Sequence, residues 1–284
     1  MRAVSLHRDV IVVTSALLQV TCTIVRGPSA GLPDAAQEGR GAQRPHDGTD
    51  VDGAAETFVV DSPLLPDELE LLPSLVQQAG FPPPSGLLAT HGDWDHLLGR
   101  LAFPSVALGC SEGTSKRLDA EPGAAQRELR SFDERLYIQR AHPLALGSIQ
   151  ALPVPGNCGI GDAELELHPA EGHTADGMVV LIPWAGVLLA GDHLSAVEIP
   201  TLNAGGDLDA YLATLERLRP LARASEHVVP GHGPVIDATA ALAVLDEDLA
   251  YLNAVRDRGA DAELPAGRRS RQQRRLHAEN VAAL

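Results

Sequence analysis

The segment His91-Gly92-Asp93-Trp94-Asp95-His96 places four side chains that can bind a metal within six residues. Packing alone does not favour such a group, because each buried imidazole or carboxylate must be paired or hydrated to offset its lost solvation. In an extended chain His91, Asp93 and Asp95 point to one side, and His96 turns inward as the following helix begins. A bound cation would supply the missing compensation, so this segment is the first candidate metal site.

Further candidate ligands follow short apolar runs elsewhere in the chain. The runs and their ligands are 86–90 with His91, 165–170 with His173, 187–190 with Asp192 and 227–229 with His232. We interpret the runs as strands that deliver polar side chains at their C-terminal ends. Strands fix the position of such side chains while the adjoining loops leave access for a ligand.

Composition restricts the class of protein and its partners. The chain has 284 residues and 44% apolar content, which is enough to bury one large core. Its formal charge of -16 opposes non-specific attraction to nucleic acid or to anionic lipid. We therefore expect a small-molecule partner, with no nucleic acid and no membrane. The three cysteines are too scattered for a disulfide framework or a thiolate zinc site, which favours a cytoplasmic location.

The apolar stretch from Val10 to Val25 is the candidate for a targeting or membrane segment. Polar residues such as Thr14, Ser15 and Gln19 interrupt it, and it is shorter than a membrane span requires. Its richness in β-branched residues instead predicts a pair of strands.

The remaining organisation follows from turn residues and apolar spacing. Residues 27–55 hold almost no large apolar residue, and we expect a mobile loop inserted between two strands. Order resumes with a strand at 57–60. Helices are predicted at 66–78, 115–119, 124–137, 238–256 and about 270–283, and another that Asp207 caps and Pro220 ends.

Together with His173, Asp192 and His232, the first segment resembles the motifs of the metallo-β-lactamase superfamily. The superfamily motif reads H-x-H-x-D-H, followed by a distant His, a bridging Asp and a final His, whereas this chain reads H-x-D-x-D-H. The resemblance covers roughly residues 10–237 and includes Pro230-Gly231-His232-Gly233-Pro234. It implies an α/β (α+β) fold, a four-layer αβ/βα sandwich, with a catalytic domain at 1–240 and a C-terminal helical extension at 241–284.

The resemblance also implies a ligand set for two divalent metal ions. One ion would be held by His91, Asp93 and His173, the other by Asp95, His96 and His232, and Asp192 would bridge them. A hydroxide between the ions would attack a carbonyl or phosphoryl centre, with Asp95 orienting it as the catalytic residue. Zinc is the expected metal. Asp93 stands where the superfamily most often has histidine, and its harder carboxylate improves the prospects of manganese or iron.

Three functions follow from this pattern. The leading one is a metal-dependent hydrolase that cleaves an ester, thioester, lactone or related bond of a small molecule. The second is an oxidoreductase resembling persulfide dioxygenases, with a single iron on His91, His173 and Asp192. The third is a non-catalytic metal-binding member of the fold whose site has decayed at Asp93.

Several other residues receive less weight. We expect His193 at most to support a ligand and not to bind metal, because it is adjacent to Asp192 and adjacent residues leaving a strand point to opposite sides. Trp94 could line a substrate cleft as readily as the core. We expect the basic cluster formed by Arg268, Arg269, Arg271, Arg274 and Arg275 to be a solvated helix face, while His277 and Glu279 could reach the metal site.

Overall fold

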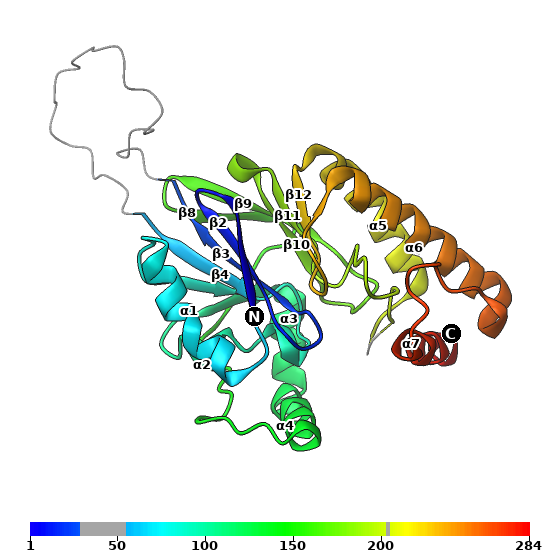
Figure 1. Ribbon diagram of the computed structural model, residues 1–284, viewed down its shortest axis with the longest axis horizontal. Coiled ribbons are helices and arrows are strands. Elements are labelled where there is room, and N and C mark those ends of the chain that lie inside the picture. Colours follow the sequence, from blue (N-terminus) through cyan, green and yellow to red (C-terminus); the bar gives the residue numbers. More distant parts are fainter. Residues whose placement is uncertain (29–54, 203–204) are drawn as a thin grey trace, which may run out of the picture.

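The computed structural model describes residues 1–28, 55–202 and 205–284, and its strands form two mixed sheets (Figure 1). The first sheet has seven strands in the order β1-β2-β3-β4-β5-β6-β7, and the second has six in the order β13-β12-β11-β10-β9-β8. The pairs β1-β2, β2-β3 and β3-β4 are antiparallel, whereas the pairs β4-β5, β5-β6 and β6-β7 are parallel. In the second sheet only β11 and β12 pair in parallel.

The elements have the following bounds. The first sheet consists of β1 (Arg2–His7), β2 (Val10–Thr14), β3 (Thr21–Arg26), β4 (Thr57–Asp61), β5 (Gly86–Leu88), β6 (Leu108–Ser111) and β7 (Ile149–Leu152). The second consists of β8 (Gly156–Ile160), β9 (Ala163–Pro169), β10 (Met178–Ile182), β11 (Val187–Leu189), β12 (His227–Val229) and β13 (Ile236–Asp237). The helices are α1 (Pro66–Gln78), α2 (Gly99–Ala102), α3 (Glu112–Ala120), α4 (Ala124–Leu136), α5 (Leu208–Ala224), α6 (Ala238–Arg258) and α7 (Arg271–Ala283).

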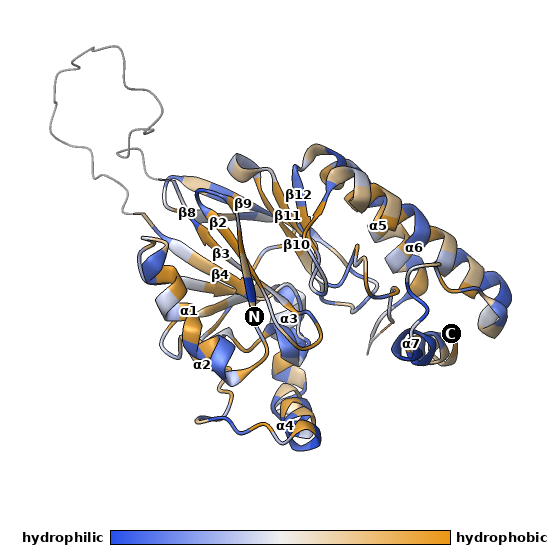
Figure 2. Ribbon diagram, viewed as in Figure 1, coloured by the Kyte–Doolittle hydropathy of each residue, from blue (hydrophilic) through white to orange (hydrophobic). Residues whose placement is uncertain are grey.

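Alternating side chains along the strands build three separate apolar layers. On β4, Val59 packs with α1 on the outer face of the first sheet, while Val60 packs between the two sheets. On β10, Val180 also packs between the sheets, and Val179 faces α5 and α6 on the outer side of the second sheet. Both faces of the central strands β4 and β10 are therefore buried. In Figure 2 the labelled strands carry much of the hydrophobic colouring. The result is the predicted four-layer αβ/βα sandwich.

Most of the predicted elements are present. The stretch from Val10 to Val25 forms the antiparallel pair β2 and β3, and the helix predicted at 66–78 is α1. Among the described residues, no helix combines the length and apolar content that a membrane span requires. Strands β3 and β4 are adjacent, so 27–55 connects two paired strands as expected, but most of it, 29–54, lies outside the described residues.

One predicted boundary is wrong. Asp207 caps α5 as expected, accepting from the backbone N–H of Ala210 at 2.8 Å, but the helix continues through Pro220 to Ala224. Proline cannot donate to the carbonyl one turn earlier, which usually ends or bends a helix. Here Leu218 and Ala222 on either side of Pro220 are buried against the second sheet, and this packing keeps the last turn helical.

Candidate metal centre

The ends of strands from both sheets bring the seven predicted ligands together. His91, Asp93, Asp95 and His96 follow β5 in the first sheet, and the last two lie in the short 3-10 helix η1 (Trp94–His96). The other three follow strands of the second sheet: His173 after β9, Asp192 after β11 and His232 after β12. Six of the seven are buried, and the side chain of Asp192 keeps 14% of its surface exposed.

Six of these residues form two compact groups, each with two imidazoles and one carboxylate. The first group is His91, His173 and Asp192, and the second is Asp95, His96 and His232. Within each group the potential ligand atoms all lie within 4.8 Å of one another. Each group contains residues from both sheets, so the centre lies at the edge where the two sheets meet.

Asp192 lies between the two groups. Its Oδ2 is 3.3 Å from His173 Nε2 and 3.4 Å from His232 Nε2, and its Oδ1 is 3.2 Å from His96 Nε2. His91 Nε2 lies 3.8 Å from Oδ2. One carboxylate thus faces all four imidazoles, which is the position that a bridging ligand would need.

The second ring nitrogen of each imidazole lies beside an oxygen. His173 Nδ1 is 2.9 Å from the carbonyl of Thr201, and His232 Nδ1 is 2.9 Å from the carbonyl of Leu18. His91 Nδ1 lies 3.1 Å from Thr90 Oγ1, and His96 Nδ1 lies 3.1 Å from an oxygen of Asp61. The two carbonyls can only accept, so His173 and His232 donate from Nδ1, and Nε2 is the ring atom that faces the centre and is available to a metal.

Buried polar atoms at the centre show that its residues fit a metal. Within the described part of the chain, His91 Nε2, His96 Nε2 and Asp192 Oδ1 are buried and make no hydrogen bond of good geometry, although His96 Nε2 and Asp192 Oδ1 lie 3.2 Å apart. Leaving such atoms unsatisfied is costly, since each has lost its hydration. Imidazole nitrogens and carboxylate oxygens at this spacing are ordinary donors for zinc, iron and manganese.

The electrostatics of the centre also favour a cation. Burial by itself raises the pKa of Asp192, but the charges of His232, His96 and His91 outweigh burial and hold that pKa well below its usual range. For His173, burial by itself lowers the pKa, yet its contacts with Asp192 and Asp93 raise it to about 10. The carboxylates therefore stabilise positive charge where the imidazole Nε2 atoms meet.

Asp93 is shared between the centre and an arginine. Its Oδ2 lies 3.4 Å from His173 Nε2 and 3.7 Å from His91 Nε2, beside the first group. Its Oδ1 accepts a hydrogen bond from Arg117 Nη2 at 2.7 Å, and Arg117 Nη1 donates to Asp176 Oδ1 at 3.0 Å. The role of Asp93 as a ligand stays a prediction, with one oxygen turned to the centre.

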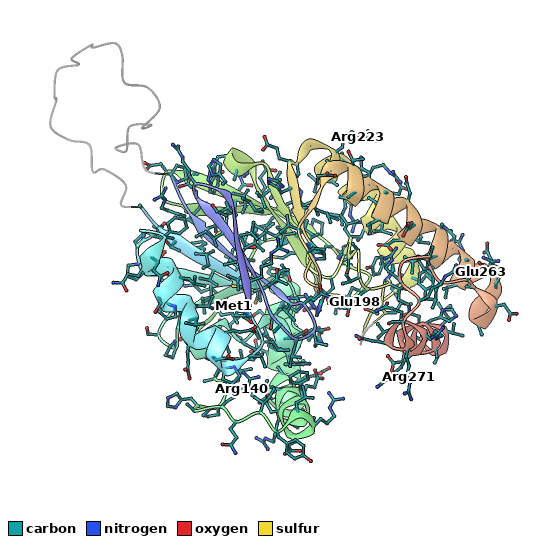
Figure 3. The ribbon with its side chains drawn as sticks, in the orientation of Figure 1. Met1, Arg140, Glu198, Arg223, Glu263 and Arg271 are labelled. Atoms are coloured by element: carbon teal, nitrogen blue, oxygen red, sulfur yellow. The ribbon has the colours of Figure 1, made fainter. Side chains whose placement is uncertain are left out.

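Sequence reasoning missed several contributors to the site. Asp61 and Thr201 contact the imidazoles from behind, Arg117 binds Asp93, and Glu198 Oε2 lies 4.0 Å from His232 Nδ1. Glu198, labelled in Figure 3, belongs to the loop that connects β11 to α5. Of these, Asp61 carried a signal in the sequence, because it ends the strand that precedes the first helix. In the structure its φ is 56°.

The residues given less weight lie elsewhere. Trp94 packs on Phe132 with ring centroids 4.8 Å apart, so it belongs to the core under α4. His193 is buried against Tyr211, and burial lowers its pKa to about 3. His277 bonds to Tyr251 and does not reach the centre.

The basic cluster is solvated only in part, which corrects the prediction made for it. Arg269, Arg271, Arg274 and Arg275 are exposed. Arg268 precedes α7 and is 2% exposed, with Nη1 2.5 Å from Asp248 Oδ1. Its burial follows from this pairing with a buried carboxylate on α6, which helical spacing could not reveal.

Comparison with known proteins identifies the family. The model of the metallo-β-lactamase superfamily matches residues 51–232, which is more than half of the chain. The chain therefore belongs to the metallo-β-lactamase superfamily. A metallo-β-lactamase type 2 from Bacillus sp. (strain 170) is 33% identical over 106 residues, a match that covers 36% of this chain and only 39% of that relative.

Solved structures share the fold at low identity. A metallo-β-lactamase superfamily protein from the archaeon Sulfolobus tokodaii aligns with a TM-score of 0.63 at 15% identity, covering 98% of this chain and 100% of that one. A metallo-β-lactamase from Pontibacter korlensis gives 0.56 at 18% identity, covering 86% and 98%. A protein solved in a di-iron-bound form gives 0.55 at 21% identity, covering 81% and 95%.

Proposed function

We propose that this protein is a hydrolase with a centre for two divalent metal ions, acting on an ester, thioester, lactone or related bond of a small molecule. The observation that carries the proposal is the position of Asp192, whose two oxygens lie 3.2 to 3.8 Å from the Nε2 atoms of four histidines. One ion would be held by His91, Asp93 and His173, and the other by Asp95, His96 and His232. Asp192 would contact both.

The ions would supply Lewis-acid polarisation of the substrate and an activated water. The contribution of the protein is to hold its donors in place and keep them in the correct protonation state. Asp95 Oδ2 lies 3.4 Å from His232 Nε2, and the charges of His96 and His232 outweigh burial and lower its pKa. Asp95 therefore remains an ionised acceptor near neutral pH, which suits a residue that orients a water by accepting its proton in a hydrogen bond.

The identity of the metal rests on the donor set. Four imidazoles and three carboxylates suit zinc, which is our first assignment. The carboxylate of Asp93 is a harder donor than the usual histidine and favours iron or manganese at that ion. The di-iron form of a protein that shares the fold supports iron as the second choice.

An oxidoreductase with one iron is the second candidate. The group of His91, His173 and Asp192 is complete by itself and has the composition of a two-histidine, one-carboxylate iron site. The second group is equally complete, and this observation favours the two-metal hydrolase over both the single-iron enzyme and a decayed site.

Metal analysis combined with a substrate panel tests these alternatives. Protein purified without chelator should carry close to two equivalents of metal and hydrolyse at least one of an activated ester, a thioester, a lactone and a β-lactam. The β-lactam is included because of the relative from Bacillus. One equivalent of iron with oxygen consumption on a persulfide would favour the oxidoreductase, and absence of metal would overturn both proposals.

The remaining assignments belong to the same proposal. We place the protein in the cytoplasm, with a small molecule as its partner and neither nucleic acid nor membrane. We also keep a catalytic domain at 1–240 and a helical extension at 241–284. The extension lies outside the family match at 51–232, which raises the question of what it does.

A further inference from the structure

We infer that the C-terminal segment is part of the metal centre, and that Asn280 on α7 is a positioning residue that sets the orientation of His173. The inference rests on the proposed metal centre and adds to it a residue about 50 positions beyond the family match. The link between α7 and the centre is the loop at 195–202, which follows the ligand Asp192.

Asn280 holds this loop on both sides of Thr201. Its Oδ1 accepts from the backbone N–H of Leu202 at 2.9 Å, and its Nδ2 donates to the carbonyl of Pro200 at 2.7 Å. The second N–H of Nδ2 is also used, because Nδ2 lies 3.1 Å from the hydroxyl of Tyr251 on α6. Asn280 is 2% exposed, so water does not compete for these bonds.

Thr201 transmits this position to His173. Both its carbonyl oxygen and its Oγ1 lie 2.9 Å from His173 Nδ1. A carbonyl acceptor at Nδ1 fixes the tautomer that leaves the lone pair on Nε2, where a metal would bind. Moving the Thr201 carbonyl would therefore change both the direction and the basicity of this ligand.

Two further residues of the C-terminal segment support the same loop. Gln273 Oε1 accepts from the N–H of Ile199 at 2.7 Å, and Arg268 Nη1 donates to the carbonyls of Ser195 at 3.1 Å and Glu198 at 2.8 Å. Ser195 Oγ in turn donates to the carbonyl of His232 at 2.7 Å. The loop is thus attached to the C-terminal segment along its length and contacts a proposed ligand at each end.

The α7 helix offers a matched control. His277 lies on the same helix and bonds to Tyr251 at 3.0 Å and to the carbonyl of Ala260, but it has no bond to the 195–202 loop. Replacing His277 removes one partner of the Tyr251 hydroxyl, which also bonds Asn280, but it leaves the bonds from Asn280 to Pro200 and Leu202 in place. A general loosening of the helix can therefore be separated from a specific effect on the centre.

The test measures cobalt affinity by competition with a chelator, together with the visible spectrum of the cobalt-loaded full-length protein. Asn280→Leu should weaken cobalt binding by about 10-fold and change the spectrum, at the lower end of the loss for a direct partner of a histidine ligand, because Asn280 acts through Thr201. Asn280→Asp keeps the volume and the acceptor for Leu202 but loses the donor to the Pro200 carbonyl, so it should also weaken cobalt binding. His277→Leu should stay within about twofold of wild type. In a His173→Ala background, Asn280→Leu should have no further effect on the remaining metal.

Two results would overturn the inference: unchanged cobalt affinity in both Asn280 variants, or an equal loss in His277→Leu. The melting temperature of the metal-free proteins identifies variants that have lost the fold. If wild-type protein bound no cobalt, the proposed metal centre itself would be wrong. That result is distinct from a metal-binding protein that is indifferent to Asn280.

Discussion

The guanidinium of Arg117 donates to Asp93 at 2.7 Å and so occupies one oxygen of the carboxylate that replaces the usual histidine of the superfamily motif. The same guanidinium reaches Asp176, which accepts from the backbone N–H of Gly92 at 2.9 Å. Asp176 thus fixes both the backbone of the ligand segment and the arginine. Asp93, Asp176 and Arg117 therefore form a local network in which the arginine balances the charge of the carboxylates.

Removing the arginine should destabilise the fold. Arg117→Met leaves the carboxylates of Asp93 and Asp176 without their shared cation, and we expect a loss of about 2 kcal/mol in the free energy of unfolding. Lys116→Met is the control on the same helix, since Lys116 forms only an exposed pair with Glu112 and should change stability by less than about 0.5 kcal/mol. Urea denaturation measures both, and equal effects would show that the network adds nothing.

Restoring the usual histidine should change metal preference. Asp93→His replaces a hard oxygen donor with an imidazole, so the ratio of zinc to manganese affinity should rise by on the order of tenfold. Competition with a chelator measures the two affinities. Asp67→His, at an exposed position of α1, is the control for an added histidine. An unchanged ratio would mean that Asp93 is not a ligand and serves only to bind Arg117.

Asp192 separates metal catalysis from a structural interpretation of the cluster. Asp192→Asn keeps shape and volume but removes the charge that faces four imidazoles, so metal content and hydrolysis should fall together while the fold survives. We expect metal affinity to drop by at least about tenfold. Metal stoichiometry and turnover are compared with wild type at matched circular dichroism. A variant that kept both metals and full activity would show that Asp192 is no bridge.

Glu68 should make stability depend on acidic pH. Burial raises its pKa, but bonds from Ser15 and from the backbone N–H groups of Ala16 and Leu65 outweigh burial and lower it. Because the folded-state pKa lies below the unfolded one, this stabilisation is present above the unfolded pKa and is lost as pH falls through the folded pKa. Glu68→Gln should cost about 2 kcal/mol at pH 7 and much less at about pH 3.5.

Urea titrations at the two pH values measure the effect of Glu68→Gln. Glu70→Gln, at an exposed position of the same helix, is the control and should show no such difference. A cost for Glu68→Gln that did not change with pH would mean that the carboxylate acts by shape and not by charge.

The sequence predicted what depends on local pattern. The apolar runs before His91, His173, Asp192 and His232 predicted the strands, and the residues after their turns are the candidate ligands. The sequence alone can show these features because each candidate ligand lies only a few residues beyond the end of its strand. Hence all seven candidate ligands could be named, and the structure brings all seven together.

What was missed depends on contacts between distant segments. Arg117 is one of several arginines on polar helices, and only the tertiary fold brings it to Asp93. Asn280 could not be predicted for the same reason. An asparagine in a polar C-terminal helix carries no sequence signal of burial, yet Asn280 is buried against the loop that contacts His173. At Pro220 the local pattern predicted the end of a helix, but the packing of α5 outweighed that preference and the helix continues.

Each of the two ligand groups draws its members from both sheets, and this has a mechanical consequence. An ion in either group would be a cross-link between residues after β5 in the first sheet and residues after β9, β11 or β12 in the second. Its binding energy would therefore resist sliding of one sheet over the other, in addition to fixing the donors. Neither half of the chain holds a complete set of donors, so occupancy of the centre would report that the two halves have assembled.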